Sequence, residues 1–532
     1  MTRFPKSFVF ICGLASALGF APLGAWPVTI IAFALFLAAV QQATSLRSAA
    51  TRGFLFSLGH FLVGLNWIAG AFHFQDSMPE YFGWFAVIIV SLIMAPYGAI
   101  ASAAAWRVGR GNGTTFILIF AASWIVCEWL RATLFTGFAW NPLGVVLIDV
   151  PLVRDTARVV GTYGLSAWIT VTAGIIMLWV PRWIAGIKYG RRDGTWPAYA
   201  IGGPVILFMA LAITASAINR FDLFPYPDRI DRPVVRVIQP NIGQQYKHEE
   251  AFAGVNFGKL ERLSGKPGSK PRLILWPEAA IPDYLDEQDG EAQAARARIV
   301  RLLGPQDILL TGGVKRHFKR TQVGPFIEQE LVGARNALFA VNAKGQLLAR
   351  YDKAHLVPGG EYLPFKPLLT AIGLSRLVPG TVDFWPGPGP RSLSIPAFGK
   401  IGVQICYEVI FSGHVIDRAN RPDFLFNPSN DAWFGAWGPP QHLAQTRLRA
   451  IEEAMPIVRS TPTGISAIID ARGIVVNSVP LGQPGFIETE LPMPAPPTLF
   501  SKFGNVMPFV LAFLLVVLAV ALHLKRRYGN RT

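Results

Sequence analysis

The sequence predicts a polytopic α-helical membrane domain joined to an extracytoplasmic α/β domain. Hydrophobic residues make up 52% of the chain and charged residues only 15%, whereas soluble domains carry about a quarter charged residues. Apolar stretches of spanning length recur over residues 1–218 and return once near the C-terminus. The segment between them changes to short β-rich runs interleaved with helical patterns.

The apolar stretches indicate about eight membrane-spanning helices, since each span needs roughly 20 mostly apolar residues. Seven fall in the expected membrane domain 1–218, and the eighth is a C-terminal span at 506–524. A cleaved signal peptide is the alternative for the first stretch, because Arg3 and Lys6 precede it. The six spans that follow favour a retained helix. The expected first seven spans are 7–23, 27–43, 54–73, 82–105, 114–132, 160–181 and 198–218.

Basic residues occupy every second connection between the expected spans. The intervening connections are nearly uncharged or acidic, as in HFQDSMPEY. Connections rich in Lys and Arg are cytoplasmic by the positive-inside rule, so we expect both termini inside and the α/β segment outside. The net charge of +16 is explained by these loops and indicates no nucleic-acid partner. The basic residues are Arg3, Lys6, Arg47, Arg52, Arg107, Arg110, Arg182, Lys188, Arg191, Arg192 and Lys525 to Arg527.

The outer segment carries the pattern of a layered α/β domain. Its apolar runs are short and bounded by turn signals, which is typical of strands buried on both faces. Examples are PVVRVIQP, RLILWPEA, KIGVQICYE and DFLFNPSN. Helical patterns lie between some of them, at 287–303 and 439–455. Strands interleaved with helices predict a layered α/β domain. The segment between the expected membrane domain and the C-terminal span is long enough to form a hydrophobic core of its own.

Cys406 is the only cysteine of the outer domain, because Cys12 and Cys127 fall in expected spans. The outer compartment is oxidising, and structural cysteines there are normally paired. An unpaired thiol is then either well buried or chemically employed. Packing is the alternative, since a free cysteine behaves as a small hydrophobic residue.

A thiol nucleophile needs a base, an orienting group and a donor for the oxyanion. Glu278 ends a buried run, Lys353 and Glu361 share the segment YDKAHLVPGGEYLPF, and Cys406 lies at another strand end. Side chains that follow the ends of neighbouring strands can lie close together at one edge of the strands. No serine-hydrolase elbow, zinc motif or P-loop occurs. Histidines are the alternative bases, and no motif singles one out among His317, His355, His414 and His442.

Three motifs together resemble the nitrilase superfamily. They are W-P-E at 276–278, Y-x-K-x-H-L-V-P-x-G-E at 351–361 and C-Y-E at 406–408. The segment NPSNDAWFGAWGPPQH at 427–442 and the multi-span N-terminus make the whole chain similar to one membrane-bound branch, the apolipoprotein N-acyltransferase family. The resemblance implies a nitrilase-like αββα sandwich, a carbon-nitrogen hydrolase domain, over residues 229–494.

The resemblance also implies roles for individual residues. Glu278 would be the general base, Lys353 the residue that stabilises the oxyanion, and Cys406 the nucleophile. A second set would support them: Glu361, Tyr407 and Glu408. A third set would line the acyl-chain entrance or merely cover the core: Trp433, Phe434 and Trp437. Relatives often carry Lys-Trp after QPNI, whereas this chain has Lys247-His248. This departure argues against a lipid-facing role for an aromatic at this position and does not affect the implied chemistry.

The activity implied is transfer of an acyl chain from a membrane phospholipid, through a thioester on Cys406, to the N-terminal α-amine of diacylglyceryl-cysteine apolipoproteins. The resemblance implies no cofactor, no metal ion, a monomer, and a multi-pass protein of the bacterial inner membrane with its catalytic domain on the periplasmic side. One alternative is a membrane-tethered nitrilase or amidase that hydrolyses a small amide. The other is a transporter or scaffold with an inactive outer domain.

Overall fold

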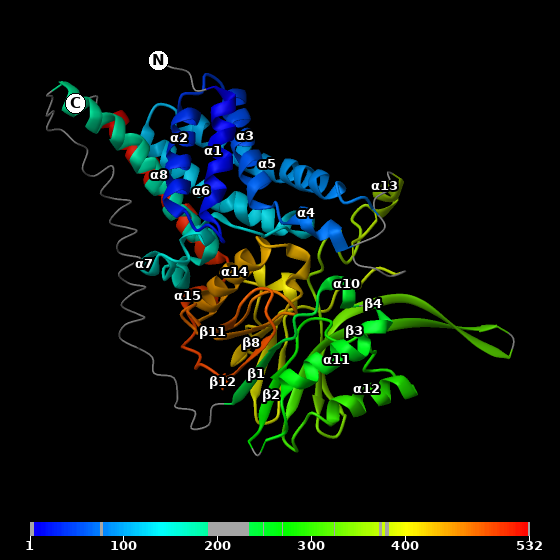
Figure 1. Ribbon diagram of the computed structural model, residues 1–532. Coiled ribbons are helices and arrows are strands. Elements are labelled where there is room, and N and C mark those ends of the chain that lie inside the picture. Colours follow the sequence, from blue (N-terminus) through cyan, green and yellow to red (C-terminus); the bar gives the residue numbers. More distant parts are fainter. Residues whose placement is uncertain are drawn as a thin grey trace. The chain divides into compact units, whose positions relative to one another are not determined.

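The computed structural model divides into two compact units (Figure 1). One consists of Met1–Ile68, Trp84–Pro225 and Pro497–Thr532, and the other of Ala69–Gly83 and Tyr226–Pro496. The expected span at 198–218 lies outside the described residues. The structure describes residues 5–74, 78–189, 233–247, 249–268, 270–323, 325–371, 375–377 and 382–529.

The first unit is helical. Its α-helices are α1 (Lys6–Ser16), α2 (Trp26–Gln41), α3 (Leu46–Gly64), α5 (Phe82–Gly109), α6 (Gly113–Thr133), α7 (Pro151–Arg154), α8 (Ala157–Tyr189), α15 (Leu499–Phe503) and α16 (Val506–Gly529). Apolar side chains stay exposed along two of the longest helices, such as Ile93 on α5 and Phe513 on α16. Such a surface is stable in hydrocarbon, where apolar side chains meet lipid tails instead of water.

The described residues contain four helices long and apolar enough to cross a membrane: Phe82–Gly109, Gly113–Thr136, Ala157–Trp179 and Val506–Lys525. α3 and the following segment Ile68–Phe74 give a fifth candidate, bent by 47°. α1 and α2 have 11 and 16 residues. At about 1.5 Å per residue, helices of that length fall short of a hydrocarbon core of about 30 Å. The structure therefore supports four or five spans, and the full set of eight stays a prediction.

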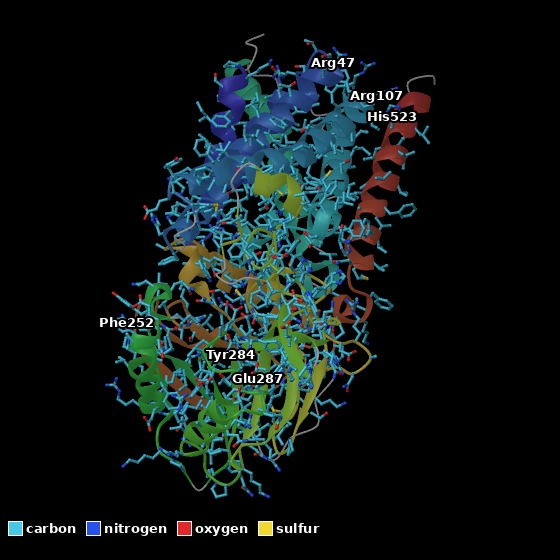
Figure 2. All side chains as sticks on the ribbon, turned by 90° about the vertical axis from the view of Figure 1, so that its right-hand side faces the viewer. Arg47, Arg107, Phe252, Tyr284, Glu287 and His523 are labelled. Carbon is cyan, nitrogen blue, oxygen red and sulfur yellow. The ribbon has the colours of Figure 1, made fainter. Side chains whose placement is uncertain are left out.

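Charged and polar side chains mark one end of this helical unit. Figure 2 shows Arg47, Arg107 and His523 near that end, from the start of α3, the end of α5 and the end of α16. All three side chains are exposed. Arg47 and Arg107 belong to the basic loops that the positive-inside rule assigns to the cytoplasm, and that orientation stays a prediction.

The second unit contains two six-stranded sheets. Their strand orders are β12-β1-β2-β3-β4-β5 and β11-β10-β9-β8-β7-β6. In each sheet three neighbouring strands run parallel, β1-β2-β3 in one and β7-β8-β9 in the other, and the remaining pairs are antiparallel. The strands are β1 (Val234–Gln239), β2 (Arg272–Leu275), β3 (Ile308–Val323), β4 (Phe326–Asn342), β5 (Leu347–Asp352), β6 (Ser392–Ile395), β7 (Gly399–Val403), β8 (Phe424–Pro428), β9 (Ile457–Ser460), β10 (Ser466–Ile469), β11 (Val475–Val479) and β12 (Gly485–Glu490).

Helices cover the outer face of each sheet. Leu260 of α11 (Glu250–Ser264) and Ile299 of α12 (Gly290–Val300) share a core with strand residues of the first sheet. Ala450 of α14 (Gly438–Glu453) does the same on the second. The two sheets also meet, since β1 contacts β9 and β10. The layers are therefore helix, sheet, sheet, helix, which confirms the α/β prediction. The short helices α10 (Gln244–Lys247) and α13 (Lys366–Ala371) also belong to this unit.

The last strand of this unit lies beside its first. β12 pairs antiparallel with β1 from Val234↔Glu490 to Gln239↔Gly485. An ion pair of 2.6 Å between Arg236 and Glu488 reinforces the pairing. The first sheet is therefore complete only when residues 485–490 are in place.

Candidate active site

Three strand ends bring the sequence-predicted triad together. Glu278 follows β2 and Lys353 follows β5 in the first sheet, whereas Cys406 follows β7 in the second. All three side chains are buried, with 7%, 1% and 4% of their surface exposed. Lys353 Nζ lies 3.5 Å from Glu278 Oε1, and the charges of both residues act on the Cys406 thiol. The site is thus shared between the two sheets.

Lys353 lies between two carboxylates. Its Nζ is 2.9 Å from Oε2 of Glu361, closer than it is to Glu278. Asn336, on β4, joins the same two carboxylates, because its Nδ2 donates to Glu278 Oε1 at 2.7 Å and to Glu361 Oε1 at 2.9 Å. The carbonyl of Asn336 accepts the backbone N–H of Lys353 at 2.8 Å. The four residues form one closed network.

The charge of Lys353 is fixed by this network. Burial alone would lower the pKa of Lys353, but the carboxylates of Glu361 and Glu278 outweigh burial and hold that pKa above its usual value. A buried charge persists only where it is paired in this way. Lys353 is therefore an ammonium at neutral pH, suited to donating to an anion and unsuited to acting as a base.

Cys406 lies at the start of a strained turn. It opens the 3-10 helix η5 (Cys406–Ile410) with φ of 52°, a region that non-glycine residues rarely adopt. Glu408 secures this turn, because its Oε2 accepts the backbone N–H of Ile405 at 2.7 Å. Its Oε1 accepts the backbone N–H of Ala354 at 2.7 Å. Glu408 thereby ties the turn with the thiol to the loop with the lysine.

The thiol of Cys406 is protonated in the resting protein. Burial raises the pKa of Cys406 to about 12, and the Glu278 carboxylate adds to the rise, whereas Lys353 opposes it. The nucleophile of a thiol is its thiolate. Cys406 therefore requires a base that removes its proton as it attacks, and Glu278 is the carboxylate of the network whose charge acts most strongly on it.

Two of the predicted supporting residues, Tyr407 and Glu408, belong to this turn. Burial raises the pKa of Glu408 to about 7, although Lys353 and the neighbouring backbone N–H groups act in the opposite direction. The hydroxyl of Tyr351 donates to Glu408 Oε1 at 2.9 Å. Tyr407 is buried, and its ring centre lies 5.9 Å from that of His355. The predicted supporting acids thus both have structural partners here, Glu361 at the lysine and Glu408 at the turn.

The three predicted lipid-contacting aromatics do not share one environment. Phe434, at the end of η6 (Asp431–Phe434), is buried with its ring centre 5.7 Å from that of His442. Trp433 is half-buried, and its ring meets that of Phe74 at 6.0 Å. Trp437 is also half-buried, directly before α14. Phe434 is a core residue, and only the two tryptophans keep partly exposed rings.

Sequence reasoning missed two polar residues of the site. Asn336 bridges both carboxylates, and Lys247 is buried with its Nζ donating to the main-chain carbonyl of Glu278 at 2.9 Å. Burial lowers the pKa of Lys247 to about 8, against the opposing charges of Glu278 and Cys406. The sequence signals for these two residues are weak. Asn336 is a single polar residue at the start of the buried run NALFAV, and Lys247 is a single lysine with no recurring pattern around it. The neighbouring His248 lies outside the described residues.

The assembled groups suit acyl transfer. A protonated thiol, a carboxylate and a permanent ammonium meet in a dry site, where charges interact more strongly than in water. A carbonyl carbon attacked by the thiol would develop negative charge on its oxygen, and Lys353 supplies a donor for it. These are the parts of a covalent acyl-enzyme mechanism.

Comparisons with known proteins agree with the motifs. A family model described as the apolipoprotein N-acyltransferase N-terminal domain matches residues 12–175, and the carbon-nitrogen hydrolase model matches 235–495. The apolipoprotein N-acyltransferase of Rhodopseudomonas palustris is 33% identical, covering 96% of this chain and 94% of that protein. That of Bradyrhizobium diazoefficiens is 34% identical, covering 98% and 94%. The chain therefore belongs to the apolipoprotein N-acyltransferase family, a multi-pass membrane branch of the nitrilase superfamily.

Proposed function

We propose that the N-acyl transfer proceeds through a thioester on Cys406, with Glu278 as the base and Lys353 as the oxyanion donor. The observation that carries this proposal is the convergence of these three buried side chains from two sheets. The raised pKa of Cys406 adds a reason for the base, because few thiols would ionise unaided.

In the first half-reaction the Cys406 sulfur attacks the ester carbonyl of a phospholipid while Glu278 takes the thiol proton. The oxyanion of the tetrahedral intermediate lies against Lys353 and the backbone N–H of Tyr407. The intermediate collapses by breaking the ester C–O bond, and Glu278 returns the proton to the alcohol oxygen. The products are a thioester on Cys406 and a lysophospholipid.

In the second half-reaction the α-amine of a diacylglyceryl-cysteine apolipoprotein attacks the thioester. Amines of this kind have pKa values of about 7.7–8.0, so a useful fraction is neutral at physiological pH. Glu278 accepts the amine proton and passes it to the departing sulfur. The C–N bond forms, the C–S bond breaks, and Cys406 is a thiol again. Water has to be kept from the thioester, since hydrolysis would compete with transfer.

The membrane helices serve this chemistry by keeping the acyl chain out of water. Moving a chain of ~16 carbons into water costs about 0.8 kcal/mol per CH₂, roughly 12 kcal/mol in total. A catalytic domain held at the bilayer surface removes that cost. We place the domain on the periplasmic side of the bacterial inner membrane, with both termini in the cytoplasm, because the basic residues fall in alternate loops. We propose a monomer as the active unit and the half-buried Trp433 and Trp437 as part of the acyl-chain entrance, with Phe434 supporting them from the core.

Mass spectrometry of the purified full chain after exposure to phospholipid tests the proposal. An acyl adduct should appear on the peptide that contains Cys406, and lysophospholipid should be released with it. Cys406→Ser and Glu278→Gln should both lack the adduct, whereas the exposed-site control Glu291→Gln should form it normally. An adduct on Cys12 or Cys127 alone, or normal adduct formation by Glu278→Gln, would contradict the assignment. Release of ammonia from a small amide without acyl transfer would instead favour the amidase alternative.

A further inference from the structure

A second polar cluster lies beneath the nucleophile and is not part of the proposed triad. It is contributed by the second sheet and the helix that covers it. None of its members exposes more than 1% of its surface, so a polar atom here is costly unless it is hydrogen-bonded inside the protein. The members are Asn427, Ser429, Asp431, His442 and Arg459.

Two members of the cluster contact the main-chain carbonyl of Cys406. His442 Nε2 lies 3.2 Å from the carbonyl oxygen of Cys406, and Asn427 Nδ2 lies 3.4 Å from the same oxygen. Neither of these two contacts is to the sulfur, which is hydrogen-bonded instead by Ser429 of the cluster. The carbonyl belongs to the residue whose φ of 52° is unusual for a side chain with a Cβ. Such a conformation costs about 1–3 kcal/mol and persists only where its surroundings hold it.

The neighbours of His442 determine where its proton lies. Nε2 faces a carbonyl oxygen, which can only accept, so Nε2 carries the hydrogen. Nδ1 lies 3.0 Å from Arg459 Nη2, which can only donate, so Nδ1 accepts. His442 is therefore neutral, and burial together with the Arg459 charge lowers its pKa in agreement with that state. Its Nδ1 also lies 3.2 Å from Asp431 Oδ1, an oxygen that takes its hydrogen bond from Arg459 instead.

Arg459 organises both donors to the carbonyl. It donates to Oδ1 of Asn427, to Nδ1 of His442 and to both oxygens of Asp431, the last two contacts at 2.6 Å each. Burial would raise the pKa of Asp431, but the Arg459 charge outweighs burial and holds that pKa well below its usual range. Asp431 is thus a permanent carboxylate that fixes the guanidinium, and the guanidinium fixes Asn427 and His442.

We infer that His442, oriented by Arg459 and Asp431, is a positioning residue for the nucleophile: by donating to the carbonyl of Cys406 it holds the left-handed turn that presents the thiol. The inference rests on the proposed function, since it concerns the rate at which Cys406 is acylated. Residue types alone suggest a different role, a Cys-His-Asp triad with His442 as the base. The geometry does not support that role, because Nε2 is committed to the carbonyl and Nδ1 to Arg459.

Two substitutions at one position test the inference. His442→Leu removes the donor, whereas His442→Gln keeps an amide N–H that can reach the carbonyl and an oxygen that can accept from Arg459. The matched control is His414→Leu, the same change at an exposed histidine of the same unit. The full-length protein in detergent with phospholipid is used throughout. Active sites are titrated by the amplitude of the lysophospholipid burst, so that loss of folded protein is separated from loss of rate. Asn427→Ser, which removes the other donor, supplies a second measurement.

The expected result is a burst rate per titrated site about 10- to 100-fold lower in His442→Leu, corresponding to one lost buried hydrogen bond. His442→Gln should stay within about threefold of the wild type, and KM for phospholipid within about twofold. The pH profile should keep its shape in His442→Gln, because a positioning residue does not titrate in the reaction. Asn427→Ser should also slow the burst.

Three results would overturn the inference. A wild-type rate per site in both His442→Leu and Asn427→Ser would show that the carbonyl needs no support. Complete loss of the burst in His442→Gln, together with loss of one limb of the pH profile, would make His442 a base. Absence of any acyl adduct in the wild type would remove the proposed thioester itself, and the inference with it. The last result is distinguished from the first two because it appears before any variant is compared.

Discussion

The ammonium of Lys247 donates a hydrogen bond of 2.9 Å to the main-chain carbonyl of Glu278. A lysine on α10 therefore holds the backbone of the residue to which we assign the base. The Lys247 side chain is buried, and burial lowers its pKa to about 8. The positive charge close to the reacting groups thus changes with pH just above the physiological range, whereas that of Lys353 does not.

Stability should depend on pH through Lys247. Its pKa is lowered from about 10.4 in the unfolded chain to about 8 in the fold, so between these values the unfolded state binds more protons. Stability then rises with pH across this window and carries a constant penalty below it. The Tm of the wild type minus that of Lys247→Met should increase from pH 8 to pH 10. The exposed Lys344→Met should give a flat difference. A Lys247 difference that falls with pH would contradict the assignment.

Neutralising Glu278 should make the Cys406 thiol react faster with an alkylating reagent and should at the same time abolish acyl-enzyme formation. The Glu278 charge contributes to the raised pKa of the thiol, so Glu278→Gln should lower that pKa and enlarge the thiolate fraction. Alkylation of Cys406 by iodoacetamide at pH 8 should become faster, by about tenfold for each unit of pKa. Acyl-enzyme formation should nevertheless be lost.

Peptide mass spectrometry separates this labelling from that of Cys12 and Cys127. Glu291→Gln, an exposed change on α12, serves as the control and should alter neither rate. Slower alkylation in Glu278→Gln would mean that the carboxylate assists ionisation in the resting protein instead of opposing it.

Asn336→Asp should slow acylation strongly, although the two side chains have nearly the same size. The change removes the amide that joins Glu278 and Glu361 and adds a third carboxylate beside them. A lost hydrogen bond to a charged group is worth about 1.5–3 kcal/mol, which corresponds to about 10- to 100-fold in the acylation rate. Asn342→Asp, at the half-buried end of the same strand, keeps an oxygen for its two backbone donors and should be neutral. Equal activity of the two variants would remove Asn336 from the network.

The orientation in the membrane can be measured with a reporter that is active only outside the cytoplasm. Fusion after Arg110, between α5 and α6, should give an inactive reporter, because this loop is basic. Fusion after Asp307, within the α/β unit, should give an active one. The opposite pattern would place the candidate site on the cytoplasmic face.

Steady-state kinetics should be ping-pong if Cys406 carries the acyl chain between two lipids. Double-reciprocal plots at several fixed acceptor concentrations should be parallel, and lysophospholipid should appear before acceptor is added. The amount in that first phase should not exceed one per enzyme, because a dry site protects the thioester. Intersecting lines with no early lysophospholipid would mean that both lipids bind together and that the thiol only packs.

The sequence reveals those parts of the site that lie at strand ends. Glu278, Lys353 and Cys406 each follow a buried run closely, so their convergence on one rim could be predicted from the pattern. Asn336 and Lys247 could not, because a single polar residue has no periodicity and gains its role only from neighbours distant in the chain. Arg459 illustrates the same limit, since it lies in the short apolar run at 456–460, whose pattern indicates a strand and no function.

The helical unit shows the complementary limit. Composition correctly predicts a membrane domain and its long helices α5, α6, α8 and α16. It does not fix where a helix ends. The stretch 7–23 reads as one span from its hydrophobicity, yet α1 ends at Ser16 and a 3-10 turn follows. The end of a helix is determined by the backbone geometry of a few residues, and hydrophobicity does not report that geometry.

The pairing of β12 with β1 makes the first sheet depend on the last residues of the α/β unit. Residues 234–239 emerge early, but they remain an unpaired sheet edge until residues 485–490 arrive from the other end of the unit. An exposed edge is a template for pairing with another chain and hence for aggregation. A chain stalled or cleaved before Gly485 would hold Glu278, Lys353 and Cys406 and still lack the strand that closes their first sheet. The first sheet can therefore close only when the chain has been made almost as far as α16, which starts 16 residues after β12 ends.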